Sequence, residues 1–143
     1  MKAITQEWLA RAAEDLAAAE ALLTRSDLTS VVAFHAQQAV EKALKAAIEE
    51  LDLPVLRTHS LVRLYELVRP HYPMITDMDM LDRLEAVYIQ SRYPGELGLL
   101  PGGKPSPEDA ADFYNFARNV FQRIQASLED AGAGVADGPE SAP

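Results

Sequence analysis

The chain has 143 residues, 48% of them hydrophobic and 24% charged, which suits one soluble domain with a single core. Its formal net charge of −9 argues against a protein that coats nucleic acid through charge alone, because such binding needs clustered lysine and arginine. The lack of cysteine excludes disulfides and thiolate metal sites, and no apolar run is long enough for a membrane span. We therefore expect a cytoplasmic protein that does not interact with membranes.

The first predicted helix covers residues 5 to 25, where apolar side chains from Trp8 to Leu23 recur at helical spacing. Its acids, Asp15 among them, are interpreted as lying largely off that apolar stripe. A second helix is predicted to run from a cap at Ser26 or Asp27 to about Leu51.

Three further helices are predicted in the second half of the chain. The short segment "SLVRLYELV" follows Thr58 and His59 and ends at a proline, and another helix covers about residues 79 to 92, before Tyr93-Pro94. After the glycine- and proline-rich stretch "GELGLLPGGKPSP", Ser106 and Pro107 are typical of a helix start. This last helix is expected to end near Asp130.

Strand signals are missing, because the sequence shows no sustained alternation of apolar and polar residues. We therefore predict an all-α fold, an antiparallel up-and-down bundle of four long helices and one short helix over residues 1 to 130. The tail "AGAGVADGPESAP" has little to bury, so residues 131 to 143 are predicted to be disordered.

The second predicted helix carries an unusual set of polar residues. His35, Gln38, Lys42 and Lys45 form a stripe away from its apolar arc, whereas Gln37 falls inside that arc and Glu41 at its edge. A buried glutamine must find hydrogen-bond partners or cost about 1–3 kcal/mol. Either Gln37 and Glu41 bond to a neighbouring helix and the lysines are solvated, or this helix lies in a dimer or lines a ligand cleft.

Four blocks in order, "WLARAAEDLAAAEALL", "AFHAQQAVEKALKAAI", "THSLVRLYEL" and "SRYPGE", resemble the HEPN domain family of prokaryotic helical proteins. The similarity covers about residues 5 to 130. The resemblance implies a bundle of four long helices and a short one, often dimeric. It also implies nucleotide binding and pairing with a minimal nucleotidyltransferase in toxin–antitoxin systems.

Many members of the superfamily are metal-independent ribonucleases, and their signature is an arginine followed, after four to six residues, by a histidine. This chain lacks that spacing, because Arg63 and His71 are separated by seven residues and no other arginine fits. Nuclease activity is therefore an open alternative. It would need His35 or His59 for proton transfer and Arg92 for the phosphate charge.

The residues that we expect to bind nucleotide or phosphate are His35, Gln38, Lys42, Lys45, His59, Arg92 and Tyr93. Lys42 and Lys45 share a helix face, so both could reach one phosphate. Arg92 and Tyr93 offer a guanidinium and an aromatic ring in adjacent positions. The structural alternatives are a helix end at "SRYP", an N-cap at His59 and a surface histidine at position 35. We expect His35, Lys42, Lys45 and Arg92 to meet in one shallow basic cleft.

No metal site or cofactor motif is predicted, because the histidines and acids are scattered and "PGGKP" lacks the spacing of a phosphate-binding loop. Three hypotheses follow. In the first, the chain is a homodimeric module that binds nucleotide or single-stranded RNA and partners a nucleotidyltransferase. In the second it is a divergent ribonuclease, and in the third it is a non-catalytic structural dimerisation partner. The homodimer is expected because five amphipathic helices leave apolar surface to cover and because Gln37 needs partners.

Overall fold

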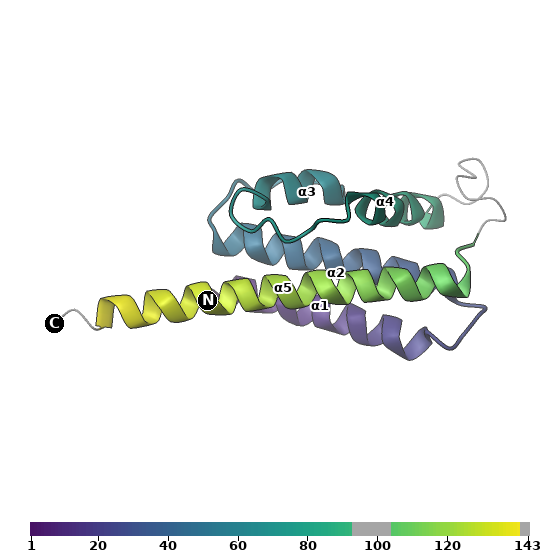
Figure 1. Cartoon of the computed structure of the whole chain (residues 1–143), viewed down its shortest axis with the longest axis horizontal. Coiled ribbons are helices and arrows are strands. Elements are labelled where there is room, and N and C mark those ends of the chain that lie inside the picture. Colours follow the sequence, from purple (N-terminus) through teal and green to yellow (C-terminus); the bar gives the residue numbers. More distant parts are fainter. Residues whose placement is uncertain (93–103, 141–143) are drawn as a thin grey trace.

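The computed structural model describes residues 1–92 and 104–140, with side chains at 1–89 and 104–131. Its helices are α1 (Ala3–Leu22), α2 (Thr29–Glu50), α3 (Leu61–Val68), α4 (Met78–Arg92) and α5 (Pro107–Glu140). Helices α1, α2 and α5 lie along the long axis of the molecule, with α1 running opposite to α2 and α5, whereas α4 is seen nearly end-on (Figure 1). The described residues contain no strand. The predicted all-α fold of four long helices and one short helix is confirmed.

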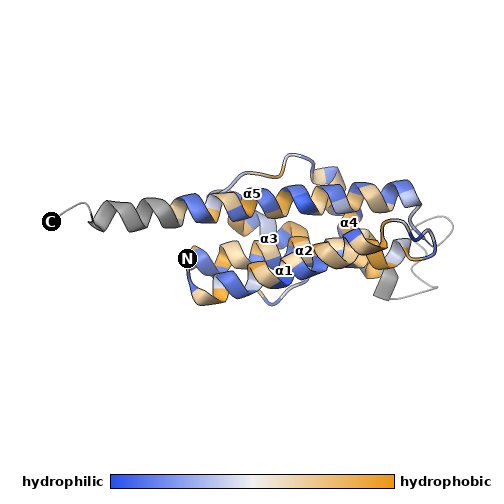
Figure 2. Ribbon diagram, turned by 90° about the horizontal axis from the view of Figure 1, so that it is seen from below, coloured by the Kyte–Doolittle hydropathy of each residue, from blue (hydrophilic) through white to orange (hydrophobic). Residues whose placement is uncertain are grey.

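Helix α2 is the centre of the bundle, because it contacts each of the other four helices. Its contact with α1 is the most extensive. Six alanines of α2 are completely buried, at positions 33, 36, 39, 43, 46 and 47. Figure 2 shows the apolar residues recurring along α1 and α2 beside polar ones. Because an alanine projects only a methyl group, neighbouring helices can approach α2 closely at these positions.

Two predicted helix boundaries differ from those observed. Helix α2 begins after Leu28, which offers no side-chain cap, so the predicted cap at Ser26 or Asp27 is wrong. The Asp27 carboxylate instead pairs with the Arg25 guanidinium at 2.8 Å. At the other end of the chain, α5 continues to Glu140 rather than ending near Asp130.

The start of α5 forms as predicted. The backbone N–H of Asp109 donates to Ser106 Oγ at 3.0 Å, and the Ser106 N–H donates to Asp109 Oδ2 at 3.3 Å. This reciprocal pair is a capping box, which satisfies N–H groups that the first helical turn leaves free.

The connection between α2 and α3, residues 51–60, folds back along α2. Asp52 adopts a left-handed φ of 54°, and the N–H of Leu53 donates to the carbonyl oxygen of Ile48 at 3.0 Å. This closes the helix and reverses the chain. Residues 55 to 59 therefore lie beside the polar face of α2, and Ser60 rather than His59 caps α3.

Glu50 joins the end of α2 to the start of α1. Its Oε1 accepts from the Thr5 hydroxyl and from the Lys2 backbone N–H, both at 2.9 Å. Burial alone would raise the pKa of Glu50, but these hydrogen bonds and nearby positive charges outweigh burial and hold the pKa below its usual range. Thr5 itself is completely buried, so this contact is part of the packed interior.

A polar network over helix α2

The polar stripe of α2 is organised by two buried carboxylates. Asp15 comes from α1 and is 8% exposed, whereas Glu41 comes from α2 itself and is 3% exposed. Each carboxylate contacts one histidine and one lysine. A buried charge needs such partners, because leaving it unpaired in the interior is costly.

We call the first group the Asp15 centre. Its two oxygens contact two different residues of α2: Oδ1 lies 2.9 Å from His35 Nδ1, and Oδ2 lies 2.7 Å from Lys42 Nζ. The side chains of His35 and Lys42 are 27% and 24% exposed. His35 and Lys42 are seven residues apart and so lie on one helix face, which places both opposite a single acid of α1. The centre therefore ties α1 to α2.

The sequence pattern predicts that Asp15 lies largely off the apolar stripe of the first helix, whereas the structure buries it. The signal was present, because Trp8, Ala12, Asp15 and Ala19 follow one another at steps of four, three and four residues. Such spacing puts the acid in the middle of the face that α1 turns toward α2. An acid flanked by alanines on a buried face predicts a cationic partner on the next helix.

The second group, the Glu41 centre, is built differently. Lys45 Nζ contacts Glu41 Oε2 at 3.0 Å one turn along the same helix, and its ammonium lies 5.4 Å from the centre of the Trp8 ring. His59, from the connection to α3, places Nδ1 at 3.2 and 3.3 Å from the two oxygens. The His59 side chain is 62% exposed. A buried carboxylate thus supports a histidine that faces solvent.

Gln37 completes the Glu41 centre and is itself fully buried. Its amide nitrogen donates to Glu41 Oε1 at 3.2 Å and to the carbonyl oxygen of His59 at 3.5 Å, and its oxygen accepts from Gln38 Nε2 at 2.7 Å. The prediction that this glutamine needs partners is confirmed. Those partners all lie within one chain, so Gln37 no longer argues for a dimer.

Aromatic rings connect the two histidines. The Phe34 ring lies 5.3 Å from the His35 ring and 6.0 Å from the Tyr88 ring of α4, and the Tyr88 ring lies 6.0 Å from that of His59. Because these rings form a chain of contacts from one centre to the other, the two histidines belong to the same side of the molecule.

The predicted site is therefore brought together in part. His35, Gln38, Lys42, Lys45 and His59 join one network, but as members of ion pairs and hydrogen bonds rather than as the free cations of the expected basic cleft. The stripe is not simply solvated either, since its lysines are about three-quarters buried. The Arg92 side chain and Tyr93 lie outside the described residues.

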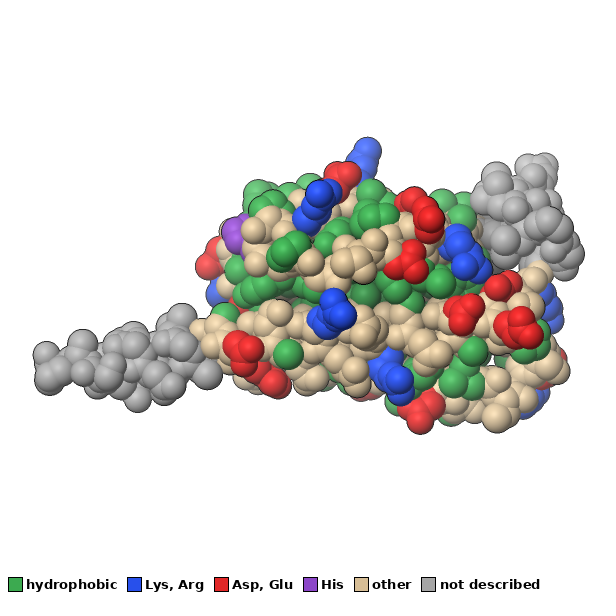
Figure 3. Space-filling view, in the orientation of Figure 1, with side chains coloured by type: hydrophobic (Ala, Val, Ile, Leu, Met, Phe, Trp, Pro, Cys, Tyr) green, Lys and Arg blue, Asp and Glu red, His purple; other side chains and the backbone are tan. Residues whose placement is uncertain are grey.

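One further face of the described residues can be seen directly. The surface of α5 with α3 and α4 above it carries bases and acids interspersed (Figure 3). Within the described residues no group of three metal-ligating side chains is found. No helix over residues 1–92 and 104–140 is long and apolar enough to cross a membrane.

Comparison with known proteins identifies the family. The HEPN domain profile matches residues 5–127, so the chain belongs to the HEPN domain family. Among solved structures, TT1696 from Thermus thermophilus is 24% identical with a TM-score of 0.73, over 86% of this chain and 97% of that one. ST0689, an archaeal HEPN homologue, is 23% identical with a TM-score of 0.65, over 90% and 99%.

Identities this low establish a shared fold and leave the chemistry of the site to be argued from this chain. No curated protein matches the sequence.

Proposed function

We propose that this protein is a nucleotide- or RNA-binding HEPN protein that partners a minimal nucleotidyltransferase in a toxin–antitoxin-type pair. The observation that supports the binding role is His59, which is exposed and held by the buried Glu41. Lys45 already balances the charge of Glu41, so a proton on His59 adds a positive charge that a phosphate can meet. The exposed imidazole also offers a flat face to a base.

The binding role is tested with a labelled single-stranded RNA and with labelled ATP and GTP, by fluorescence anisotropy over a series of salt concentrations. Binding should weaken as salt rises, because phosphate contacts release counterions. Replacing His59→Gln should weaken binding about tenfold, the usual scale for losing one charged hydrogen bond. His71→Gln is the matched control, since His71 is also exposed but lies outside the network. No binding by the wild-type chain at low salt would refute the proposal.

Variants of Lys42 and Lys45 give a second test of the binding site. Lys42 and Lys45 already pair with Asp15 and Glu41, so each must turn outward or share its charge to contact a ligand. The variant Lys42→Gln with Lys45→Gln should flatten the salt dependence of binding. An unchanged affinity and salt dependence would restrict the site to His59 and its surroundings.

The nucleotidyltransferase partnership is supported only by the family. It is tested by examining the gene beside this one and by co-purifying the two products. A neighbouring gene of another class, with no complex formed, would refute this part and leave the binding role standing.

One observation favours a second candidate, metal-independent RNA cleavage. With Nδ1–H of His59 donating to Glu41, Nε2 is left to accept or deliver a proton, as in other carboxylate-oriented histidines. Cleavage of a fluorogenic RNA in excess EDTA tests this idea, and both His59→Ala and Glu41→Gln should abolish it. Activity that survives both changes would come from elsewhere or from a contaminant.

The third candidate is a structural role in a homodimer, which we retain as part of the proposal. Its remaining support is exposed apolar side chains such as Ile4, Val31 and Ile89, which are 45%, 37% and 40% exposed. Light scattering should give twice the chain mass of 15.7 kDa at micromolar concentration. A monomer would refute the dimer without affecting the binding test.

A further inference from the structure

A small cavity lies beside the Glu41 centre, between α1, α2 and the 51–60 connection. We call it the cup, and its volume is about 160 Å³. This is close to the roughly 150 Å³ that holds one benzene ring, so the cup fits a single ring or branched side chain. It is lined by Trp8, Lys45, Ile48, Glu49, Val55, Leu56, Arg57 and Leu64.

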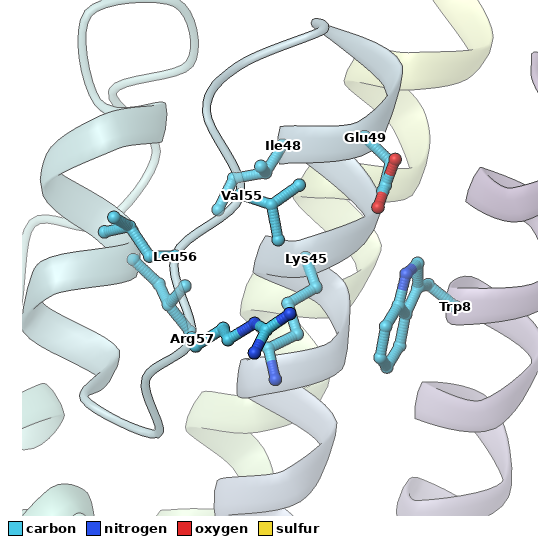
Figure 4. A pocket seen from close by; sticks show the side chains of 8 residues that line it. Trp8, Lys45, Ile48, Glu49, Val55, Leu56 and Arg57 are labelled. Carbon is cyan, nitrogen blue, oxygen red and sulfur yellow. The ribbon is translucent and has the colours of Figure 1, made fainter.

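Most of the cup wall is apolar, but its charged groups are arranged in a definite way. Figure 4 shows Arg57 reaching from the connection toward Lys45 on α2, with Trp8 of α1 on the other side of Lys45. Glu49 lies one helical turn beyond Lys45, toward the end of α2 (Figure 4). The cations and the acid are therefore separated along the cup.

Hydrogen-bond donors at the cup outnumber acceptors. Among the described residues Arg57 forms no ion pair, and Lys45 has Glu41 as its single carboxylate partner. A group that brings several oxygen acceptors next to an apolar side chain would complement this lining.

We propose that the cup binds the apolar C-terminal residue of a partner polypeptide, with its carboxylate on Arg57 and Lys45. The cations line the same small cavity as Ile48 and Val55, so a ligand that carries its carboxylate and its apolar group on one carbon fits both. A C-terminal leucine or phenylalanine has this form, whereas a nucleotide separates its base from its phosphate by a ribose. The amide N–H of the same residue can donate to Glu49.

This inference goes beyond the proposed function. It concerns a protein ligand, and it does not require the chain to bind nucleotide or RNA. Of the residues in the proposed nucleotide site, only Lys45 lines the cup.

The cup contains its own reporter, because Trp8 is the only tryptophan of the chain. An acetylated tetrapeptide ending in leucine with a free carboxylate should change the tryptophan fluorescence in a saturable way. The same peptide with a C-terminal amide should bind about tenfold more weakly, since it loses the charge-assisted hydrogen bonds. Equal binding of acid and amide, or no saturable change with either, would overturn the proposal.

Two variants with matched controls locate the effect. Arg57→Gln should weaken binding of the acid to the level of the amide, while Arg63→Gln, an exposed arginine of α3, should leave it unchanged. Val55→Asp places a negative charge at the rim, where Val55 is 68% exposed, and should prevent binding, whereas Val31→Asp should not.

Circular dichroism of all four variants checks that the fold is intact. Unchanged binding by both folded cup variants would overturn the assignment. Free leucine binding as tightly as the peptide would overturn the polypeptide as ligand.

Discussion

The two carboxylate centres use the same chemistry in two positions of the bundle. Asp15 contacts a histidine and a lysine across a helix–helix interface, and both partners are mostly covered. Glu41 contacts a lysine of its own helix and a histidine that is 62% exposed. Because only the ion pairs of the first set join two long helices, we assign that set mainly to stability and the second mainly to ligand contact.

The largest effect is expected from Asp15→Ala. It removes the counter-charge of both His35 and Lys42 at a buried interface, and unfolding in urea should show a loss of about 2 kcal/mol. Glu14→Ala is the control, because Glu14 is the exposed neighbour of Asp15 on α1. A loss equal to that of the control would mean that the Asp15 centre does not hold α1 to α2.

Glu50 also joins α1 to α2, but its hydrogen bonds come from a hydroxyl and a backbone N–H, whereas those of Asp15 come from a lysine and a histidine. A variant of Glu50 therefore compares the two kinds of contact. Glu50→Gln should cost about 1 kcal/mol at neutral pH. The pKa of Glu50 is lowered in the folded chain, so its contribution is present above the usual glutamate range.

That contribution is lost as the pH falls through the folded pKa. Urea unfolding of wild type and Glu50→Gln should therefore converge in acid. A difference that stays constant down to low pH would show that packing, not ionisation, is responsible.

Variants of His35 and His59 test most directly whether the Asp15 centre stabilises the fold and the Glu41 centre contacts ligand. His35→Gln should lower stability by about 0.5 to 1 kcal/mol, because His35 is mostly covered and bonded to a buried acid. His59→Gln should change stability by less than about 0.5 kcal/mol, as is usual at exposed positions. Thermal melts of both variants compare them. Equal losses would contradict the division of roles between the centres.

The smallest effect is expected far from both centres, from removing residues 132 to 143. The sequence of this segment has few apolar side chains to anchor it, so the melting temperature should stay the same. A drop of several degrees, the scale of about 1 kcal/mol in a domain of this size, would show that the segment docks on the bundle.

Local patterns predicted the fold well, since helical spacing and the Ser106 capping signal depend on neighbours in the sequence. The cap predicted at Ser26 or Asp27 is wrong, because α2 begins after Leu28 and the Asp27 carboxylate pairs with Arg25 instead. For the site, helical spacing correctly grouped His35 with Lys42. Their carboxylate partner, Asp15, lies on another helix. Spacing within one helix does not specify how two helices pack, so this pairing could not be predicted. Arg57 was missed as a pocket residue because only the reversal after α2 brings it beside Lys45.

Two buried alanines of α2, Ala39 and Ala46, share the helix face of His35 and Lys42, and this has a consequence for how the sequence can change over time. Their methyl groups fix how far apart α1 and α2 lie, and so they also set the reach from Asp15 to Lys42 and His35. A larger side chain at position 39 or 46, three or four residues from His35 or Lys42 and so on the same helix face, would push α1 outward and lengthen both contacts. Substitutions at these alanines are therefore constrained by the ion pairs of the Asp15 centre. We expect Ala39, Ala46 and the Asp15 centre to have been inherited together in relatives that retain either.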